Sequence, residues 1–287
     1  MLLALDTSTS QASVALTHDE RLLAELSWEV GRRHSQELPD RMSAVLRIAG
    51  ARPADLTGVA VALGPGSFNG ARVAVTTAKL LALTLSIPVY GAATLDAIAA
   101  GHAIAGGTLI AILDAGRGEV YAAAYSASFA GSASGLDAPD HVASAAISGS
   151  DAERRDTVEG PRMLLPGLWR ASAPAIATPA HLADATPGDP LLCGEWRDET
   201  GAALRAAFGA RARFAPRLGG MGGRRAVWLA ALVAARLAAG ATDSAAAGAA
   251  GDDPARLEPL YLRRPAITTS ARPENQVSGG VATTAGS

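Results

Sequence analysis

The first thirty residues alternate between short apolar stretches and polar turns. Residues 2–5, 12–16 and 22–26 are mostly apolar, and polar residues separate them at 6–10 and 18–20. Turns as short as these connect neighbouring strands that run in opposite directions. We therefore expect an antiparallel meander of three strands at the start of the chain.

The apolar residues 56–63 predict a buried strand, and a loop rich in glycine, residues 64–72, follows it directly. The glycines permit a tight turn, and Ser67 or Asn69 can cap a helix over residues 69–85. A strand, a glycine-rich turn and a helix N-terminus can together bind an anion. This loop, however, lacks the Lys-Ser/Thr ending of a P-loop.

The helix predicted over residues 69–85 is apolar around most of its circumference. Its polar positions are Thr76, Thr77, Lys79 and Thr84. A helix that is apolar all round must be covered on both sides. Two interpretations remain open: a central helix buried in its own domain, or one that packs on its own sheet and on another subunit.

Apolar spacing predicts the remaining elements. Further helices are expected at residues 35–49, from Thr94 onward, and at 179–185, 200–208 and 224–239. Further strands are expected at residues 88–91, 108–113, 119–125, 163–168 and 191–193. An acidic turn follows the buried strand that opens each half, at Asp6 and again at Asp114. This repeat predicts an α/β fold that arose by internal duplication.

Composition and charge narrow the classes of function. The 287 residues are enough for two domains, and the net charge of -2 argues against a dedicated nucleic-acid binder. The single Cys193 excludes an internal disulfide and fits a reducing compartment. We see no signal peptide and no apolar stretch long enough to span a bilayer. The expected location is the cytoplasm, without membrane contact.

Two turns carry the candidate chemistry. The first holds Asp6, Thr7, Ser8 and Thr9, and the second holds Asp114 and Gly116. Carboxylates and hydroxyls in such turns can bind a phosphate or a metal-bound water, but they also form turns by bonding to their own backbone. His34 has Leu38 one helical turn later instead of a second ligand. We therefore expect no metal, no cofactor and no catalytic residue.

Four stretches in this order resemble the TsaB family. They are residues 1–9 (MLLALDTST), 64–72 (GPGSFNGAR), 112–115 (ILDA) with 118–121 (GEVY), and 259–263 (PLYLR). The family supplies the dimerisation subunit of the bacterial machinery that makes threonylcarbamoyladenosine beside the tRNA anticodon. The resemblance implies a duplicated actin-like (ribonuclease H-like) fold of two lobes, with mixed five-stranded sheets and helices. The superfamily also contains proteins once described as glycoproteases.

The resemblance implies a division of the chain. The first lobe comprises residues 1–106 together with a returning helix at 224–240. The second, degenerate lobe comprises residues 107–223 and contains an insertion at 126–160. Residues 241–287 form a linker and a disordered tail.

The resemblance also implies a non-catalytic role. The partners would be a TsaD-like catalytic subunit and a TsaE-like ATPase, with tRNA contacted only indirectly and a homodimer formed when the chain is alone. The family's catalytic paralogue TsaD carries a metal-binding histidine pair on its first long helix, and His34 with Leu38 resembles a degenerate copy of that site. Helices of the first lobe form the contact with TsaD. The contact residues expected here are Leu38, Met42, Val45, Val73, Thr76, Thr77 and Leu80.

Three positions depart from the family pattern. Asn69 replaces a usual Thr, Leu80 a usual Gly, and Gly116 a usual Arg. Gly116 makes the second turn look more like that of an active actin-like ATPase. An alternative function is therefore an ATPase or small-molecule kinase that uses Asp6 and Asp114 around Mg-ATP. A third interpretation is a homodimer with an unrelated role.

Overall fold

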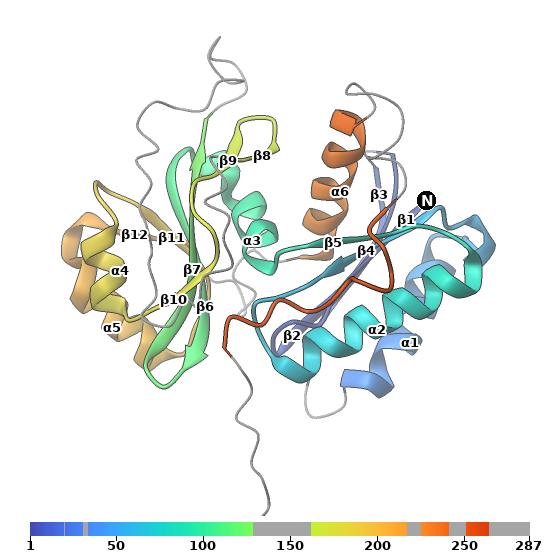
Figure 1. The fold of residues 1–287 in the computed structure, drawn as a ribbon, viewed down its shortest axis with the longest axis horizontal. Helices are drawn as coiled ribbons and strands as arrows, with labels where there is room; N and C mark the ends of the chain where they lie inside the picture. The colour runs from blue at the N-terminus through green and yellow to red at the C-terminus, as the bar shows by residue number, and fades with distance from the viewer. Residues whose placement is uncertain (20, 31–33, 129–161, 217–224, 241–250, 264–287) are drawn as a thin grey trace, which may run out of the picture.

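The computed structural model describes residues 1–19, 21–30, 34–128, 162–216, 225–240 and 251–263 (Figure 1). The first sheet contains β1 (Leu2–Asp6), β2 (Gln11–His18), β3 (Arg21–Glu29), β4 (Gly58–Ala62) and β5 (Val89–Ala92). Its strand order is β3-β2-β1-β4-β5. The first three strands pair antiparallel, as the short polar turns predict, and β4 and β5 are parallel to β1.

The second sheet repeats this pattern. Its strands are β6 (Gly107–Gly116), β7 (Glu119–Ala127), β8 (Arg162–Leu165), β9 (Leu168–Arg170), β10 (Ala175–Ala177), β11 (Leu191–Glu195) and β12 (Arg213–Phe214). β7 pairs antiparallel with β6, while β11 is parallel to β6 and β12 to β11. These relations match those of β2, β4 and β5 around β1. The predicted α/β class, with two copies of one strand pattern, is therefore confirmed.

The second sheet differs from the prediction in size, since it has seven strands instead of five. Residues 163–168, expected as one strand, belong to the β8–β9 hairpin. The hairpin turns at Gly167, which has φ +77°, and a Cβ there would lie 2.4 Å from the Ser128 carbonyl oxygen. Only glycine fits so close to another backbone. The short strands β10 and β12 carry too few residues for a period-2 pattern to reveal them.

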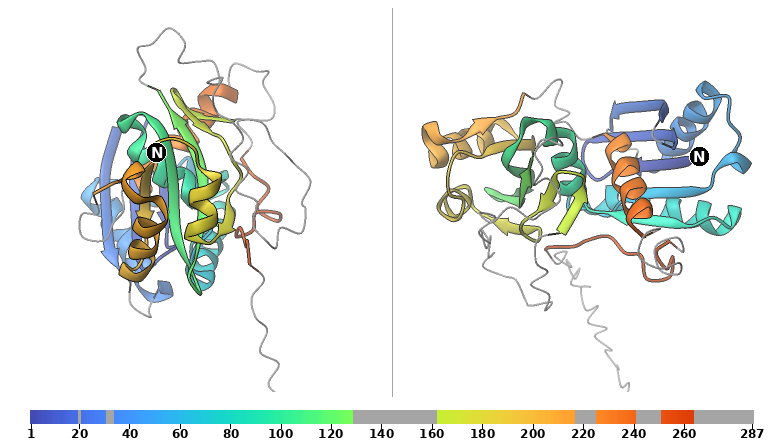
Figure 2. Two further views of the ribbon diagram at one scale, coloured as in Figure 1. Left: turned by 90° about the vertical axis from the view of Figure 1, so that its left-hand side faces the viewer. Right: turned by 90° about the horizontal axis from the view of Figure 1, so that it is seen from above.

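Six α-helices of the described residues cover the sheets. They are α1 (His34–Ile48), α2 (Phe68–Leu85), α3 (Thr94–His102), α4 (Pro179–Ala185), α5 (Asp198–Phe208) and α6 (Ala226–Gly240). α1 and α2 pack on the outer face of the first sheet, and α4 and α5 on the outer face of the second. α3 and α6 lie between the two sheets (Figures 1 and 2).

Alternation along the strands explains the layers, because successive side chains point to opposite faces. On β1, Leu3 and Leu5 belong to the core beneath α1 and α2, whereas Ala4 faces the middle layer. On β6, Ile110 and Ile112 face α4 and α5. The middle core joins residues of both sheets to α3 and α6. Most of the predicted insertion lies outside the described residues, as do residues 241–250 and 264–287 of the predicted linker and tail. The predicted division into lobes stays a prediction.

Candidate functional site

The glycine-rich loop packs tightly on the turn that follows β1. The Ser67 amide donates to the Ser8 carbonyl oxygen at 2.6 Å, and Thr7 Oγ1 donates to the Gly70 carbonyl oxygen at 2.6 Å. A Cβ on Gly70 would lie 1.9 Å from the Thr7 oxygen, so this contact requires glycine. Ser67 caps α2, with its Oγ accepting from the Gly70 amide at 3.3 Å. Of the two caps predicted from the sequence, Ser67 and Asn69, the structure therefore has Ser67.

The first acidic turn is buried and bonded to itself. Asp6, Thr7 and Ser8 have no exposed surface. Asp6 Oδ1 accepts from the Ser8 amide at 2.9 Å and from Ser8 Oγ at 2.6 Å. Thr94 Oγ1 then donates to Ser8 Oγ at 3.1 Å. These bonds are those of a turn that holds its own backbone, one of the two roles predicted for it.

The second acidic turn is bonded to the helix that follows β11. Asp114 accepts from Arg197 Nε and Nη2, each at 3.0 Å, and from Thr200 Oγ1 at 2.7 Å. The Gly116 amide donates to it at 2.9 Å. Burial raises the pKa of Asp114, but the hydrogen bonds from Arg197, Thr200 and Gly116 outweigh it and lower this pKa to about 2. A cation bound at Asp114 would therefore compete with a guanidinium already in place.

Asp114 should contribute a measurable pH dependence of stability. Its folded pKa is depressed, so the stabilisation is complete above about pH 4, the ordinary range of an unfolded aspartate, and is lost as the pH falls toward about 2. We expect Asp114→Asn to flatten the pH dependence of the free energy of unfolding within this window, measured by urea titration. Asp189→Asn, at an exposed aspartate, is the control and should keep the parent profile. A parent-like profile for Asp114→Asn would contradict the prediction.

A cleft of about 610 Å³ separates the two turns. Its lining comprises Thr9, Ser10, Gln11, Glu29, Gly66, Ser67, Leu113, Asp114, Ala115, Gly116, Tyr121, Glu195, Trp196 and Arg197. Of the predicted turn residues, Thr9, Asp114 and Gly116 reach the cleft, whereas the other three are buried beneath it. Thr9 Oγ1 donates to Glu195 Oε2 at 2.6 Å, joining the end of β11 to the β1–β2 turn.

The sequence analysis missed Glu195 and Arg197. The available signal was their position, directly after the predicted strand at residues 191–193, because carboxyl ends of parallel strands commonly carry functional side chains. No three His, Cys, Asp or Glu side chains of the described residues are grouped so that they could hold a metal ion. The side chain of His34 lies outside the described residues.

The outward face of α2 forms a second candidate site. Ala74, Val75, Ala78 and Ala82 are buried against the first sheet. On the opposite face Leu80 is 60% exposed and Leu83 is 67% exposed. We call the outward residues Phe68, Arg72, Val73, Thr76, Thr77, Leu80 and Leu83 the α2 stripe. Thr76 is exposed, and Val73 and Thr77 are half-buried.

The predicted contact residues on α1 need correction. Leu38 and Val45 have no exposed surface, and Met42 is only 9% exposed. α1 has a single apolar stripe, and the first sheet already covers it. In this structure these three side chains therefore cannot reach a partner. The exposed apolar residue of α1 is Ile48, at 61%.

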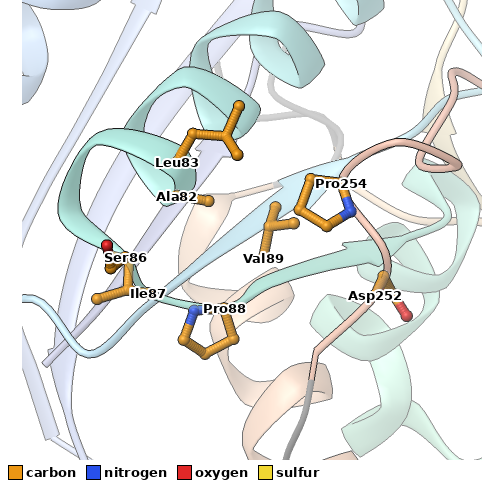
Figure 3. Close-up of a pocket in the computed structure, with 8 residues that line it drawn as sticks. All are labelled: Ala82, Leu83, Ser86, Ile87, Pro88, Val89, Asp252 and Pro254. Atoms are coloured by element: carbon orange, nitrogen blue, oxygen red, sulfur yellow. The ribbon is translucent and has the colours of Figure 1, made fainter.

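A hollow of about 330 Å³ lies at the end of α2 (Figure 3). Ala82 and Leu83 of α2 line it together with Val89 of β5 and with Asp252 and Pro254 of the C-terminal segment. The Asp252 carboxylate is engaged by the Gly91 amide at 2.7 Å and by Arg236 Nη2 at 2.6 Å. The hollow therefore shows mainly how closely residues 251–263 approach α2.

Part of the sequence is similar to proteins of threonylcarbamoyladenosine biosynthesis. The family described as tRNA N6-adenosine threonylcarbamoyltransferase, TsaD, matches residues 28–153. The tRNA threonylcarbamoyladenosine biosynthesis protein TsaB of Bacillus subtilis is 36% identical over 124 residues, 43% of this chain and 54% of that protein. The predicted resemblance to TsaB is confirmed. TsaB of Escherichia coli is 36% identical over 126 residues, again 43% of this chain and 54% of the relative.

The structural comparison extends further along the chain than the sequence matches to TsaB. YeaZ from Pseudomonas aeruginosa is 24% identical with a TM-score of 0.64, covering 91% of this chain and 99% of its own. At this identity the likeness shows the fold alone. The chain matches about half the length of each of these two TsaB proteins. No helix of the described residues is long and apolar enough to cross a membrane.

Proposed function

We propose that this chain is a non-catalytic subunit of a tRNA threonylcarbamoyladenosine-forming complex, in which it dimerises with and activates a TsaD-like catalytic subunit. A TsaE-like ATPase would join the complex, tRNA would be contacted only indirectly, and the chain would form a homodimer when alone. The similarity to TsaB proteins supports a role in the formation of tRNA threonylcarbamoyladenosine. The observation that supports binding to a TsaD-like partner is the exposed apolar surface of the α2 stripe.

The α2 stripe exposes two leucines on a helix whose other face is fully packed. Leu80 and Leu83 lie about one turn apart, and each residue is more than half exposed. Large apolar side chains grouped on one outward helix face mark surfaces that bind another protein. Leu80 stands where the TsaB family usually has Gly, so the shape of this contact would differ from that of relatives.

The two carboxylates of the acidic turns give the alternative ATPase or kinase function less support than the α2 stripe gives the partner role. An enzyme that binds Mg-ATP needs carboxylates available to the metal. Asp6 is buried in its own turn, and Asp114 is held by Arg197 and Thr200. Both carboxylates are thus engaged by groups of the chain itself.

The proposal is tested by Leu80→Glu in the chain co-expressed with the TsaD-like protein of the same organism. A charge buried at an interface core costs several kcal/mol, so the dissociation constant should rise at least about 100-fold. Binding is measured by calorimetry, and threonylcarbamoyladenosine by mass spectrometry of tRNA nucleosides from a strain that carries only the variant. We expect both signals to be lost.

The matched control is Ile104→Glu, because Ile104 is 82% exposed but lies in the short helix after α3. This variant should bind and support modification like the parent chain. Circular dichroism should show that both variants fold, since Leu80 is solvent-exposed. Parent-like affinity of a folded Leu80→Glu chain would contradict the proposed contact.

A further inference from the structure

The C-terminal segment 251–263 begins on the edge of the first sheet. The Asp252 amide donates to the Val89 carbonyl oxygen at 2.8 Å, and the Gly91 amide donates to Asp252 Oδ2 at 2.7 Å. Five residues on, Leu257 is 7% exposed and belongs to the core beneath α1 and α2. Backbone pairing and apolar burial therefore anchor this end of the segment on the first sheet.

The middle of the segment lies along the start of the glycine-rich loop. The Leu260 amide donates to the Leu63 carbonyl oxygen at 2.7 Å. A Cβ on Gly64 would lie 3.3 Å from the Leu260 carbonyl oxygen, so the two backbones are nearly in contact. The Tyr261 ring packs on Phe68, with 4.9 Å between ring centroids. The motif at residues 259–263, which the function proposed above does not use, thus contacts the loop directly.

The far end of the segment reaches the second sheet. Arg263 Nη1 donates to the Ala115 carbonyl oxygen at 3.1 Å, and Arg263 forms an ion pair with Glu119. Both partners belong to the β6–β7 hairpin. In Figure 1 the segment runs from β5 across the front of the molecule toward this hairpin. One continuous stretch of chain therefore bridges the two sheets.

Both attachment points adjoin walls of the cleft. On the first-sheet side, Leu63 and Gly64 lead directly into Gly66 and Ser67, which line it. On the second-sheet side, Ala115 itself lines the cleft. Within the cleft, the bond between Thr9 and Glu195 joins the same two sheets. A displacement of the hairpin would therefore change the width of the cleft.

We propose that residues 251–263 form a strap that sets the distance between the two walls of the cleft. Backbone hydrogen bonds, apolar burial and a ring contact fix the strap to the first sheet and its loop. The contacts with the β6–β7 hairpin given above are all made by the Arg263 side chain. Loss of that side chain would leave the strap attached to the first sheet and release the β6–β7 hairpin. The cleft would then open and sample a wider range of widths.

The test is a distance measurement between spin labels on Arg47→Cys of α1 and Ala203→Cys of α5, which are both exposed positions on opposite outer layers. Cys193 is buried, and burial raises its pKa to about 12, so it should not take up label. In the parent chain we expect one narrow distance distribution. In Arg263→Ala we expect a broader distribution with a longer mean distance.

The matched control is Arg256→Ala, because Arg256 pairs with Asp253 inside the strap at 3.6 Å and its side chain is 90% exposed. It should reproduce the parent distribution. If Arg263→Ala fails to fold, Glu119→Gln takes its place, since it removes the ion pair and keeps the side-chain shape. A distribution identical to that of Arg256→Ala, in whichever of the two variants folds, would show that the other contacts between the two sheets set the width of the cleft, and would overturn the proposal.

Discussion

Replacement of Gly70 by alanine should lower the free energy of unfolding by about 3 kcal/mol or more. The added Cβ would lie 1.9 Å from the Thr7 carbonyl oxygen, a distance that two non-bonded heavy atoms do not tolerate. The Cβ would be fixed to the backbone of α2 and would meet the backbone of Thr7, so no side-chain rotation can relieve the clash. Either α2 must move off the β1–β2 turn or the turn must move, and Thr7 then loses its bond to the Gly70 carbonyl oxygen.

The sign of this effect is informative, because in an ordinary helix the same change stabilises by about 1 kcal/mol. Asn69→Ala, at the exposed neighbouring position, is the control and should change stability by less than about 0.5 kcal/mol. Urea unfolding followed by circular dichroism measures both. A Gly70→Ala chain as stable as the parent would mean that the loop and the turn are not in contact.

Replacement of Asp96 by alanine should cost about 3 kcal/mol. Asp96 lies in the first turn of α3 and is 6% exposed. Its Oδ1 accepts from the Tyr125 hydroxyl at 2.9 Å, and Arg170 Nη1 pairs with its Oδ2 at 3.2 Å. The substitution removes an acceptor shared by two polar groups from β7 and β9, and the Tyr125 side chain is almost fully buried. The penalty combines a lost buried ion pair with a hydroxyl deprived of this partner.

Two further variants separate these contributions. Burial raises the pKa of Asp96, which shows that the charged form is costly at this position. Asp96→Asn keeps an acceptor without the charge, so its loss should be smaller, about 1 kcal/mol. Tyr125→Phe removes only the hydroxyl and should also cost about 1 kcal/mol. Thermal unfolding of the three variants provides the comparison, and equal losses for Asp96→Ala and Asp96→Asn would rule out the acceptor as the stabilising feature.

Local pattern in the sequence was enough to predict most helices and strands, because apolar spacing depends only on neighbours along the chain. The antiparallel meander, α2 and the repeat of an acidic turn after β1 and β6 all follow from such spacing, whereas the choice of Ser67 over Asn69 as the cap does not. The repeat also predicted an internal duplication, and the strands around β6 pair as those around β1 do. Elements of two or three residues, such as β10 and β12, are too short to carry this signal.

The sequence by itself determined the fold class, the duplicated pattern and the order of the main elements. Only the tertiary structure decided which face of α2 is outward. It also showed that Leu38, Met42 and Val45 are buried against the first sheet. It alone paired Arg197 with Asp114, 83 positions apart, and Arg263 with Ala115, 148 positions apart. Contacts over such separations depend on how the chain topology brings whole layers together, and periodicity within one segment contains no information about them.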